Sequence, residues 1–171
     1  TGTFDNVTVE YSTNNGTSYN AITGAESVEA SIGYYAWQVY DVPSDTVVIR
    51  VSNAGTEPVD AGVSDTIAIK PTLTLTAPDH SSFWEVGKTY DITWTKNGTI
   101  SAVTLEYSVD GGTSYETTAI ASGIDATGVP ADSYKYTWTA LDIIGDQVVI
   151  KITNDDDSTV YDESEAFEVA G

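Results

Sequence analysis

Several residue types are absent or scarce in this chain of 171 residues, and each absence excludes a class of function. There is no cysteine, which excludes a disulfide, a thiolate metal site and a cysteine nucleophile. The single histidine cannot build a histidine-based metal centre. Only 6 residues are basic against 26 acidic ones, so the net charge is −20. Nucleic acids and anionic membranes are bound through clustered Lys and Arg, and we therefore expect neither as a partner.

Long hydrophobic runs are missing as well. No stretch approaches the roughly 18 apolar residues of a membrane-spanning helix, so we expect no membrane insertion within this segment. There is no methionine and no basic-then-apolar leader at the start. We therefore interpret the chain as a processed product or a piece of a longer protein. The apolar fraction of 40% and the aromatic fraction of 11% predict packed cores.

The dominant pattern is a period of two. Apolar and polar residues alternate in short runs such as Val7–Tyr11, Tyr90–Trp94 and Val103–Tyr107. Each run turns one face to a core and the other to solvent, as a half-buried β-strand does. Turn sequences such as Asn14-Asn15-Gly16 and Asp110-Gly111-Gly112 separate the runs. Short strands with regular turns predict an all-β sandwich fold.

The chain also repeats its own sequence. Five segments match in order: Val7–Ser12 with Val103–Ser108, Gly16–Tyr19 with Gly112–Tyr115, Tyr35–Trp37 with Tyr136–Trp138, Val47–Asn53 with Val148–Asn154, and Thr66–Ile69 with Ala166–Val169. Ordered matches of this kind indicate two copies of one domain. We assign residues 1–70 to the first domain and 71–171 to the second, with a short join that Pro71 stiffens.

The two copies differ at their fronts. The second carries two additional strand-like runs, Leu73–Thr76 and the segment from Trp84 to Trp94, whereas the first begins at Phe4 in what should be its third strand. A sandwich without two strands exposes unpaired backbone edges and half a core. Either upstream sequence was removed or another molecule supplies strands by β-augmentation. A third alternative is that the missing strands are dispensable.

A longer motif runs through the second copy. It comprises Ala77-Pro78, Trp84–Gly87, Ile92–Thr95, Glu106–Tyr115, Tyr136–Trp138, Val148–Ile152 and Asp162–Phe167. With this motif, residues 72–171 resemble the Ig-like domains that include the serine/threonine-rich yeast cell-wall family and its bacterial and archaeal surface counterparts, and residues 4–70 resemble them in truncated form. The resemblance implies two tandem Ig-like β-sandwiches, the first lacking its opening two strands. It implies no catalytic residues.

One acidic turn is a candidate metal site. Its residues are Asp155, Asp156 and Asp157, with Asp162 shortly downstream. Calcium takes six to eight oxygen ligands, which turns between strands can supply. The spacing does not match the twelve-residue calcium loop, and a solvated acidic turn is the alternative. No other cofactor is expected.

Three Asn-x-Thr sequons are candidate glycosylation sites, and they begin at Asn6, Asn15 and Asn97. Two of them lie in sequences typical of tight turns, where a glycan would project into solvent. We therefore expect N-linked glycans at these residues where the source cell makes them. The abundance of Ser and Thr in the chain also allows such sequons to arise by chance.

The tryptophans and the single histidine are better interpreted as structural residues than as catalytic or binding residues. Trp94 lies in the apolar phase of its run, and Trp37 and Trp138 match in the repeat, so we expect all three in cores. Trp84 lies where a loop enters a strand, and both packing and a surface contact remain open for it. His80 has no nucleophile-elbow sequence nearby, so we interpret it as an exposed turn residue and predict no enzyme.

A rigid, repetitive, acidic chain suits an extracellular structural element. We predict a subunit or repeat segment of a cell-surface filament, stalk or surface layer, with the open first sandwich completed by strands from a neighbouring unit or an upstream segment. Its partners would be copies of itself or adjacent repeats, joined by β-strand addition, and glycans. The alternative is an adhesin or a carbohydrate-binding or spacer module of a larger secreted protein, using exposed aromatics such as Trp84, Tyr34 or Tyr35.

Overall fold

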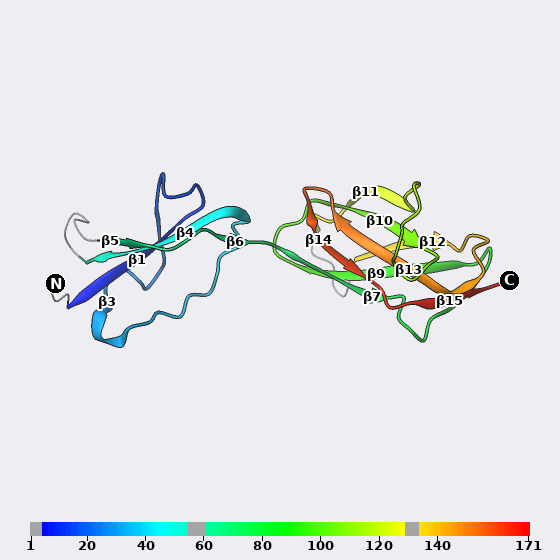
Figure 1. The fold of residues 1–171 in the computed structure, drawn as a ribbon, viewed down its shortest axis with the longest axis horizontal. Coiled ribbons are helices and arrows are strands. Elements are labelled where there is room, and N and C mark those ends of the chain that lie inside the picture. Colours follow the sequence, from blue (N-terminus) through cyan, green and yellow to red (C-terminus); the bar gives the residue numbers. More distant parts are fainter. Residues whose placement is uncertain (1–4, 55–60, 129–133) are drawn as a thin grey trace. The chain divides into compact units, whose positions relative to one another are not determined.

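Strands are almost the only regular secondary structure in the part of the chain that the structure describes. The computed structural model describes residues 5–54, 61–128 and 134–171, and their one helical element is a 3-10 turn at Ala30–Ile32. The chain divides into two compact units, Thr1–Lys70 (unit 1) and Pro71–Gly171 (unit 2) (Figure 1). Within the described ranges, no helix is long and apolar enough to cross a membrane.

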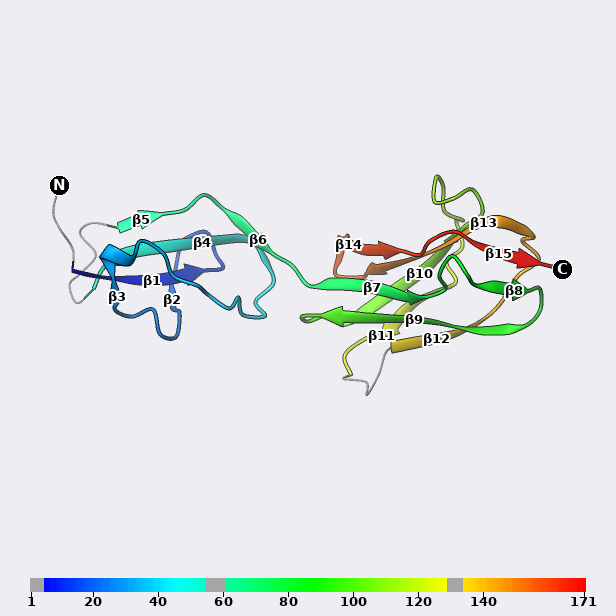
Figure 2. The same ribbon diagram turned by 90° about the horizontal axis from the view of Figure 1, so that it is seen from below.

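Unit 2 contains two sheets that pack face to face (Figure 2). The smaller sheet has the order β12-β9-β7, with bounds Tyr134–Thr139, Thr89–Asn97 and Thr72–Ala77. The larger has the order β11-β10-β13-β15-β8, with bounds Ala121–Asp125, Ala102–Ser108, Gly145–Asn154, Phe167–Ala170 and Phe83–Glu85. Strand β14, Asp157–Glu163, also pairs with β13. This arrangement is an Ig-like β-sandwich, and it confirms the predicted fold class.

The core of unit 2 lies between these sheets. Val103, Leu105 and Ile152 from the larger sheet are fully buried, and so are Ile92 and Trp94 from the smaller one. These residues occupy alternate positions of their strands, which is the geometry that places one side of each strand in a core. Their β-branched and aromatic side chains suit such a pleated surface.

Unit 1 has one sheet among its described residues. Its order is β2-β1-β4-β5, and β3 pairs with β1 while β6 pairs with β4. The bounds are Asn20–Ala21 (β2), Asn6–Ser12 (β1), Ser44–Asn53 (β4), Ala61–Val63 (β5), Val28–Glu29 (β3) and Ile67–Ile69 (β6). The segment 33–43 between the 3-10 turn and β4 forms neither helix nor strand (Figure 1).

The sequence repeat is also a repeat of strand register. Val9 lies opposite Val51 in the pair β1–β4, and the equivalent residues Leu105 and Ile152 lie opposite one another in β10–β13. The central antiparallel strand pair therefore has the same register in both units, so residues at equivalent repeat positions can be compared directly.

The turn after β1 is equally similar to the turn after its counterpart, β10. In unit 2, Ser108 Oγ accepts the backbone N–H of Gly112 at 2.9 Å, and Asp110 Oδ1 accepts that of Ser114 at 2.9 Å. Unit 1 forms the same two bonds at the same distances, with Asn14 in the place of Asp110. In each bond a side chain accepts the backbone N–H of the residue four positions later, and this indicates a structural role for both turns.

Candidate docking face of the first unit

The two units differ most in how far their equivalent core positions are covered. Val51 is 40% exposed, whereas its counterpart Ile152 is 0% exposed. Val9 is only half-buried, whereas its counterpart Leu105 is fully buried. The smaller sheet, β12-β9-β7, provides the opposite wall of the core in unit 2. Within the described part of unit 1 there is one sheet, so this face has no opposing sheet.

The lack of an opposing sheet among the described residues of unit 1 also explains why segment 33–43 is not a strand. Tyr35 and Trp37 hold the repeat positions of Tyr136 and Trp138, which lie in β12 and pair in register with β9. A strand needs a neighbour for its backbone N–H and C=O groups. No counterpart of β9 occurs among the residues of unit 1 that the structure describes, so the segment has no strand with which to pair.

Side chains hold part of this segment in place. Trp37 packs on Tyr11 with ring centroids 5.3 Å apart and on Tyr40 at 5.6 Å. Tyr40 Oη accepts the backbone N–H of Thr23 at 3.0 Å. Unit 1 therefore retains a small aromatic core at one end of its sheet, and the valines of β1 and β4 towards the other end stay partly exposed.

A cavity of about 280 Å³ opens on the uncovered region. Its lining includes the side chains Val7, Val9, Val51, Tyr34 and Tyr35, which together we call the open face. Tyr34 is 76% exposed at this site. The sequence pattern did not identify Val51 as part of a site, because its apolar phase alone indicates a core residue. The sequence did indicate an uncovered face, because the first copy of the repeat lacks the two strand-like runs that begin the second copy.

The edge of β6 is open in a similar way. In unit 2 the equivalent strand, β15, pairs in parallel with β8. This pairing brings Phe167 edge-to-face against Trp84, with ring centroids 4.7 Å apart. Ile67, the counterpart of Phe167, is exposed in unit 1. The described residues of unit 1 include no counterpart of β8, so the outer side of β6 lacks the partner that β15 has.

Trp84 is a core residue, and this corrects the surface-contact alternative. It is 5% exposed and stacks on Tyr90 with ring centroids 4.8 Å apart and an interplanar angle of 4°. Trp138 and Phe167 contact it edge-on. Because β8 pairs with β15, the indole of Trp84 is buried among Tyr90, Trp138 and Phe167. Trp84 therefore cannot offer an exposed ring to a glycan.

The acidic residues of the calcium hypothesis are not brought together as a metal site. Those residues are Asp155, Asp156, Asp157 and Asp162. Asp155 Oδ1 accepts the Thr104 hydroxyl at 2.8 Å, and Asp162 Oδ2 accepts the backbone N–H of Leu75 at 2.7 Å. Across the described ranges, no group of three or more His, Cys, Asp or Glu side chains could hold a metal ion. The calcium site stays a prediction. The exposed Asp155 and Asp156 fit the alternative of a solvated acidic turn, and Asp162 ties β14 to β7.

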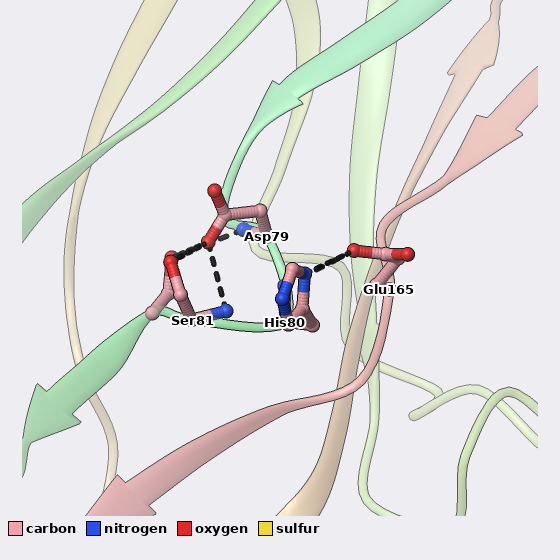
Figure 3. Close-up of polar contacts among 5 residues, drawn as sticks. Asp79, His80, Ser81 and Glu165 are labelled. Carbon is pink, nitrogen blue, oxygen red and sulfur yellow. Dashed lines mark hydrogen bonds and ion pairs between the residues drawn. The ribbon is translucent and has the colours of Figure 1, made fainter.

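His80 and its neighbours form a polar turn between β7 and β8 (Figure 3). His80 Nδ1 lies 2.8 Å from Glu165 Oε2, and both side chains are exposed. Ser81 Oγ donates to Asp79 Oδ1 at 2.8 Å and not to the imidazole, so the serine is not paired with a general base. The Ser81 hydrogen bonds to Asp79, with one from Ser82, lower the pKa of that carboxyl. The turn thus fastens the β7–β8 connection to the chain before β15.

The three sequon asparagines are all exposed. Asn6 is the first residue of β1, and Asn97 is the last residue of β9. Asn15 lies in the turn after β1 with a φ of 53°. Each amide is therefore accessible from solvent, as N-glycosylation requires, and the modification itself stays a prediction.

No protein-family model matches the chain, and no curated protein sequence matches it. The solved structure of Clostridium thermocellum CbhA fibronectin(III)-like modules is similar at 19% sequence identity, with a TM-score of 0.41. The match covers 98% of this chain and 79% of that chain.

Proposed function

We propose that the chain is a structural module of a larger extracellular assembly, such as a filament, stalk or surface layer. In this proposal, unit 1 acts as an acceptor for strands supplied from outside residues 1–171, either by a neighbouring unit or by an upstream segment. The observation that carries the proposal is the contrast between Val51, which is 40% exposed, and Ile152, which is 0% exposed at the same repeat position.

Two independent features of unit 1 are explained by the same missing partner, a pair of strands. The open face needs an apolar cover, and segment 33–43 needs a strand beside its backbone. In unit 2 one element meets both needs, because β9 pairs with β12 while Ile92 and Trp94 fill the core. An incoming strand pair of the β7–β9 kind would gain main-chain hydrogen bonds and apolar burial together, which is the basis of β-augmentation.

Composition supports an extracellular placement within this proposal. A net charge of −20 keeps an exposed surface solvated. Three exposed sequons are available for glycans. The resemblance of the sequence motif to Ig-like domains of cell-wall and surface proteins points to the same location. In the absence of cysteine, stability comes from sandwich cores and neighbouring units.

Amide hydrogen exchange tests the proposal. The protein in its native assembly is compared with the isolated chain 1–171, and the exchange of residues 33–40 is followed. We expect these amides to exchange at least about tenfold more slowly in the assembly, because a docked strand pairs with them. Equal exchange in the two samples would show that no strand docks there. The amides of β12 serve as the control, since β9 protects them in both samples.

A glycan-binding role is the second candidate, and the exposure of Tyr34 beside the cavity favours it. Exposed aromatic rings can stack on sugars, and Tyr34 is 76% exposed. A glycan array separates the two roles. Binding that is lost in Tyr34→Ala would support the glycan role, whereas an array without any signal would remove it.

A further inference from the structure

We infer that the open face selects a strand with one large aromatic side chain, which enters the cavity at the repeat position of Trp94. This inference rests on the proposed function, because it describes the partner that unit 1 accepts. The occupant is an extended strand pair of the β7–β9 type from an adjoining protein segment, with the apolar–polar alternation of β9. A second copy of the chain fits less well, because its β7 and β9 already complete its own unit 2.

Unit 2 shows what fills the equivalent space. Trp94 of β9 is fully buried in the same core cluster as Leu105 and Ile152. It lies opposite Tyr134 in the β9–β12 register, and the two rings stack with centroids 6.0 Å apart. We call three residues the wall: Tyr134 of β12, which stacks on Trp94, and Leu105 of β10 and Ile152 of β13, which belong to the same buried core.

Three positions of this wall carry smaller residues in unit 1. Val9 replaces Leu105, and Val51 replaces Ile152. Counting four residues back from the matched tryptophans Trp37 and Trp138 places Gly33 at the position of Tyr134.

All three smaller residues line the cavity. Gly33 is exposed and a Cβ built on it would meet nothing within 4 Å, so no other side chain of unit 1 takes the place that the Tyr134 ring has in unit 2. Each change enlarges the same space. Close packing then favours a large incoming side chain, because unfilled volume loses contacts.

The charge around the cavity further restricts which residue type can insert into it. Glu29 lines the cavity, and the chain as a whole carries a net charge of −20. An acidic residue at the inserting position would meet a like charge in a partly desolvated site, which is unfavourable. The remaining lining named above is apolar or aromatic. The inserting residue is therefore Trp, Tyr or Phe, and the positions beside it along the strand are polar and face solvent.

A grafted chain tests this inference. A copy of residues 71–100 is placed ahead of Asp5 in the full chain, because Ser101 holds the repeat position of Asp5 and the graft then enters in register. Two variants of the graft are compared with it. In one, the copy of Trp94 is changed to Ala. In the matched control, the copy of Thr95 is changed to Ala, since Thr95 is exposed and points to the other face of the strand.

Hydrogen exchange of residues 33–40 gives the readout. We expect the parent graft to slow exchange at least about tenfold relative to the ungrafted chain. The Trp→Ala graft should lose about 100-fold of protection or return to the ungrafted rate, whereas the Thr→Ala graft should change it less than about threefold.

The outcomes distinguish a failure of the proposed function from a failure of the aromatic requirement. A parent graft without protection contradicts the proposed function. A protective graft in which both alanine variants behave alike contradicts the aromatic requirement alone. The native assembly provides a second measurement: the residue seated between Val9 and Val51 should be aromatic, and a small or charged residue there would overturn the inference.

Discussion

Val51 and Ile152 occupy the same position of the repeat and the same register in their sheets, yet Val51 is 40% exposed and Ile152 is 0% exposed. The difference comes from what lies opposite them. In unit 2 the strand β9 covers this face with Trp94, whereas the described part of unit 1 has no such strand. Two residues that are nearly the same in chemistry thus differ in environment.

Alanine substitutions at this pair should therefore differ in cost. Ile152→Ala should lower the free energy of unfolding of unit 2 by about 2–5 kcal/mol, because it leaves a cavity in a packed core. Val51→Ala should cost unit 1 less than about 1 kcal/mol, as expected for a residue that already contacts water. Denaturant unfolding of the full chain, followed separately for each unit, gives both values. Equal costs would mean that Val51 is as well packed as Ile152.

Trp84 should behave as a core residue in the same way. Trp84→Ala should destabilise unit 2 by about 3–5 kcal/mol, because the indole packs against Tyr90, Trp138 and Phe167. Tyr34→Ala is the control, and it should change stability by less than about 0.5 kcal/mol because the ring is exposed. Thermal unfolding measures both variants. A Trp84→Ala protein with unchanged stability would restore the surface alternative.

Local alternation was sufficient to predict the strands. Runs such as Val103–Tyr107 form strands with the expected buried phase, and the internal repeat anticipated the equal registers of β1–β4 and β10–β13. These features depend on residues that are close in sequence or that repeat in order.

Features that depend on distant partners were not predictable in the same way. The segment around Tyr35 and Trp37 matches part of β12 in sequence but forms no strand, since pairing requires a neighbour that its own residues do not encode. Trp84 was ambiguous for a related reason. Its burial depends on a parallel pairing of β8 with β15, which lies more than 80 residues downstream in the sequence. The acidic turn near Asp155 left calcium and a solvated turn both open, because composition does not show where carboxylates point.

The turn at Asp110 should make the thermal stability of unit 2 depend on pH. Hydrogen bonds from the Ser114 side chain, the Ser114 backbone and the Ser108 side chain lower the pKa of Asp110 to about 2. The pKa of an Asp in an unfolded chain is about 3.9. The stability that these bonds contribute is therefore present above that pH and is lost as the pH falls towards 2. Asp110→Asn should therefore reduce the loss of thermal stability of unit 2 between pH 5 and pH 2, measured as Tm against pH.

Unit 1 provides the matched control for this prediction. Asn14 already forms the equivalent bonds, and its Nδ2 donates to Ser18 Oγ at 2.9 Å where Asp110 accepts from Ser114 Oγ at 2.6 Å. Asparagine therefore fits the turn. The reverse change, Asn14→Asp, should introduce the same acid dependence into unit 1. If neither variant alters the acid limb of the Tm profile, the Asp110 carboxylate does not contribute to folding there.

The separated units should differ in behaviour. Residues 71–171 contain a closed core between two sheets and should fold alone as a cooperative monomer. Residues 1–70 expose the open face and the edge of β6, so this fragment should self-associate and should unfold at a lower temperature than residues 71–171. Sedimentation and thermal unfolding of the two fragments give the comparison. A monomeric and cooperatively folded 1–70 fragment would show that the missing strands are dispensable.

The most direct measurement is a structure of the native assembly, imaged without separating the chain from its neighbours. We expect two additional strands on unit 1, one paired with residues 33–40 and the pair together covering Val9 and Val51. We also expect those strands to belong to protein outside residues 1–171. An open face that is in contact only with solvent in the assembled state, or one that is covered by glycan alone, would contradict strand completion of unit 1.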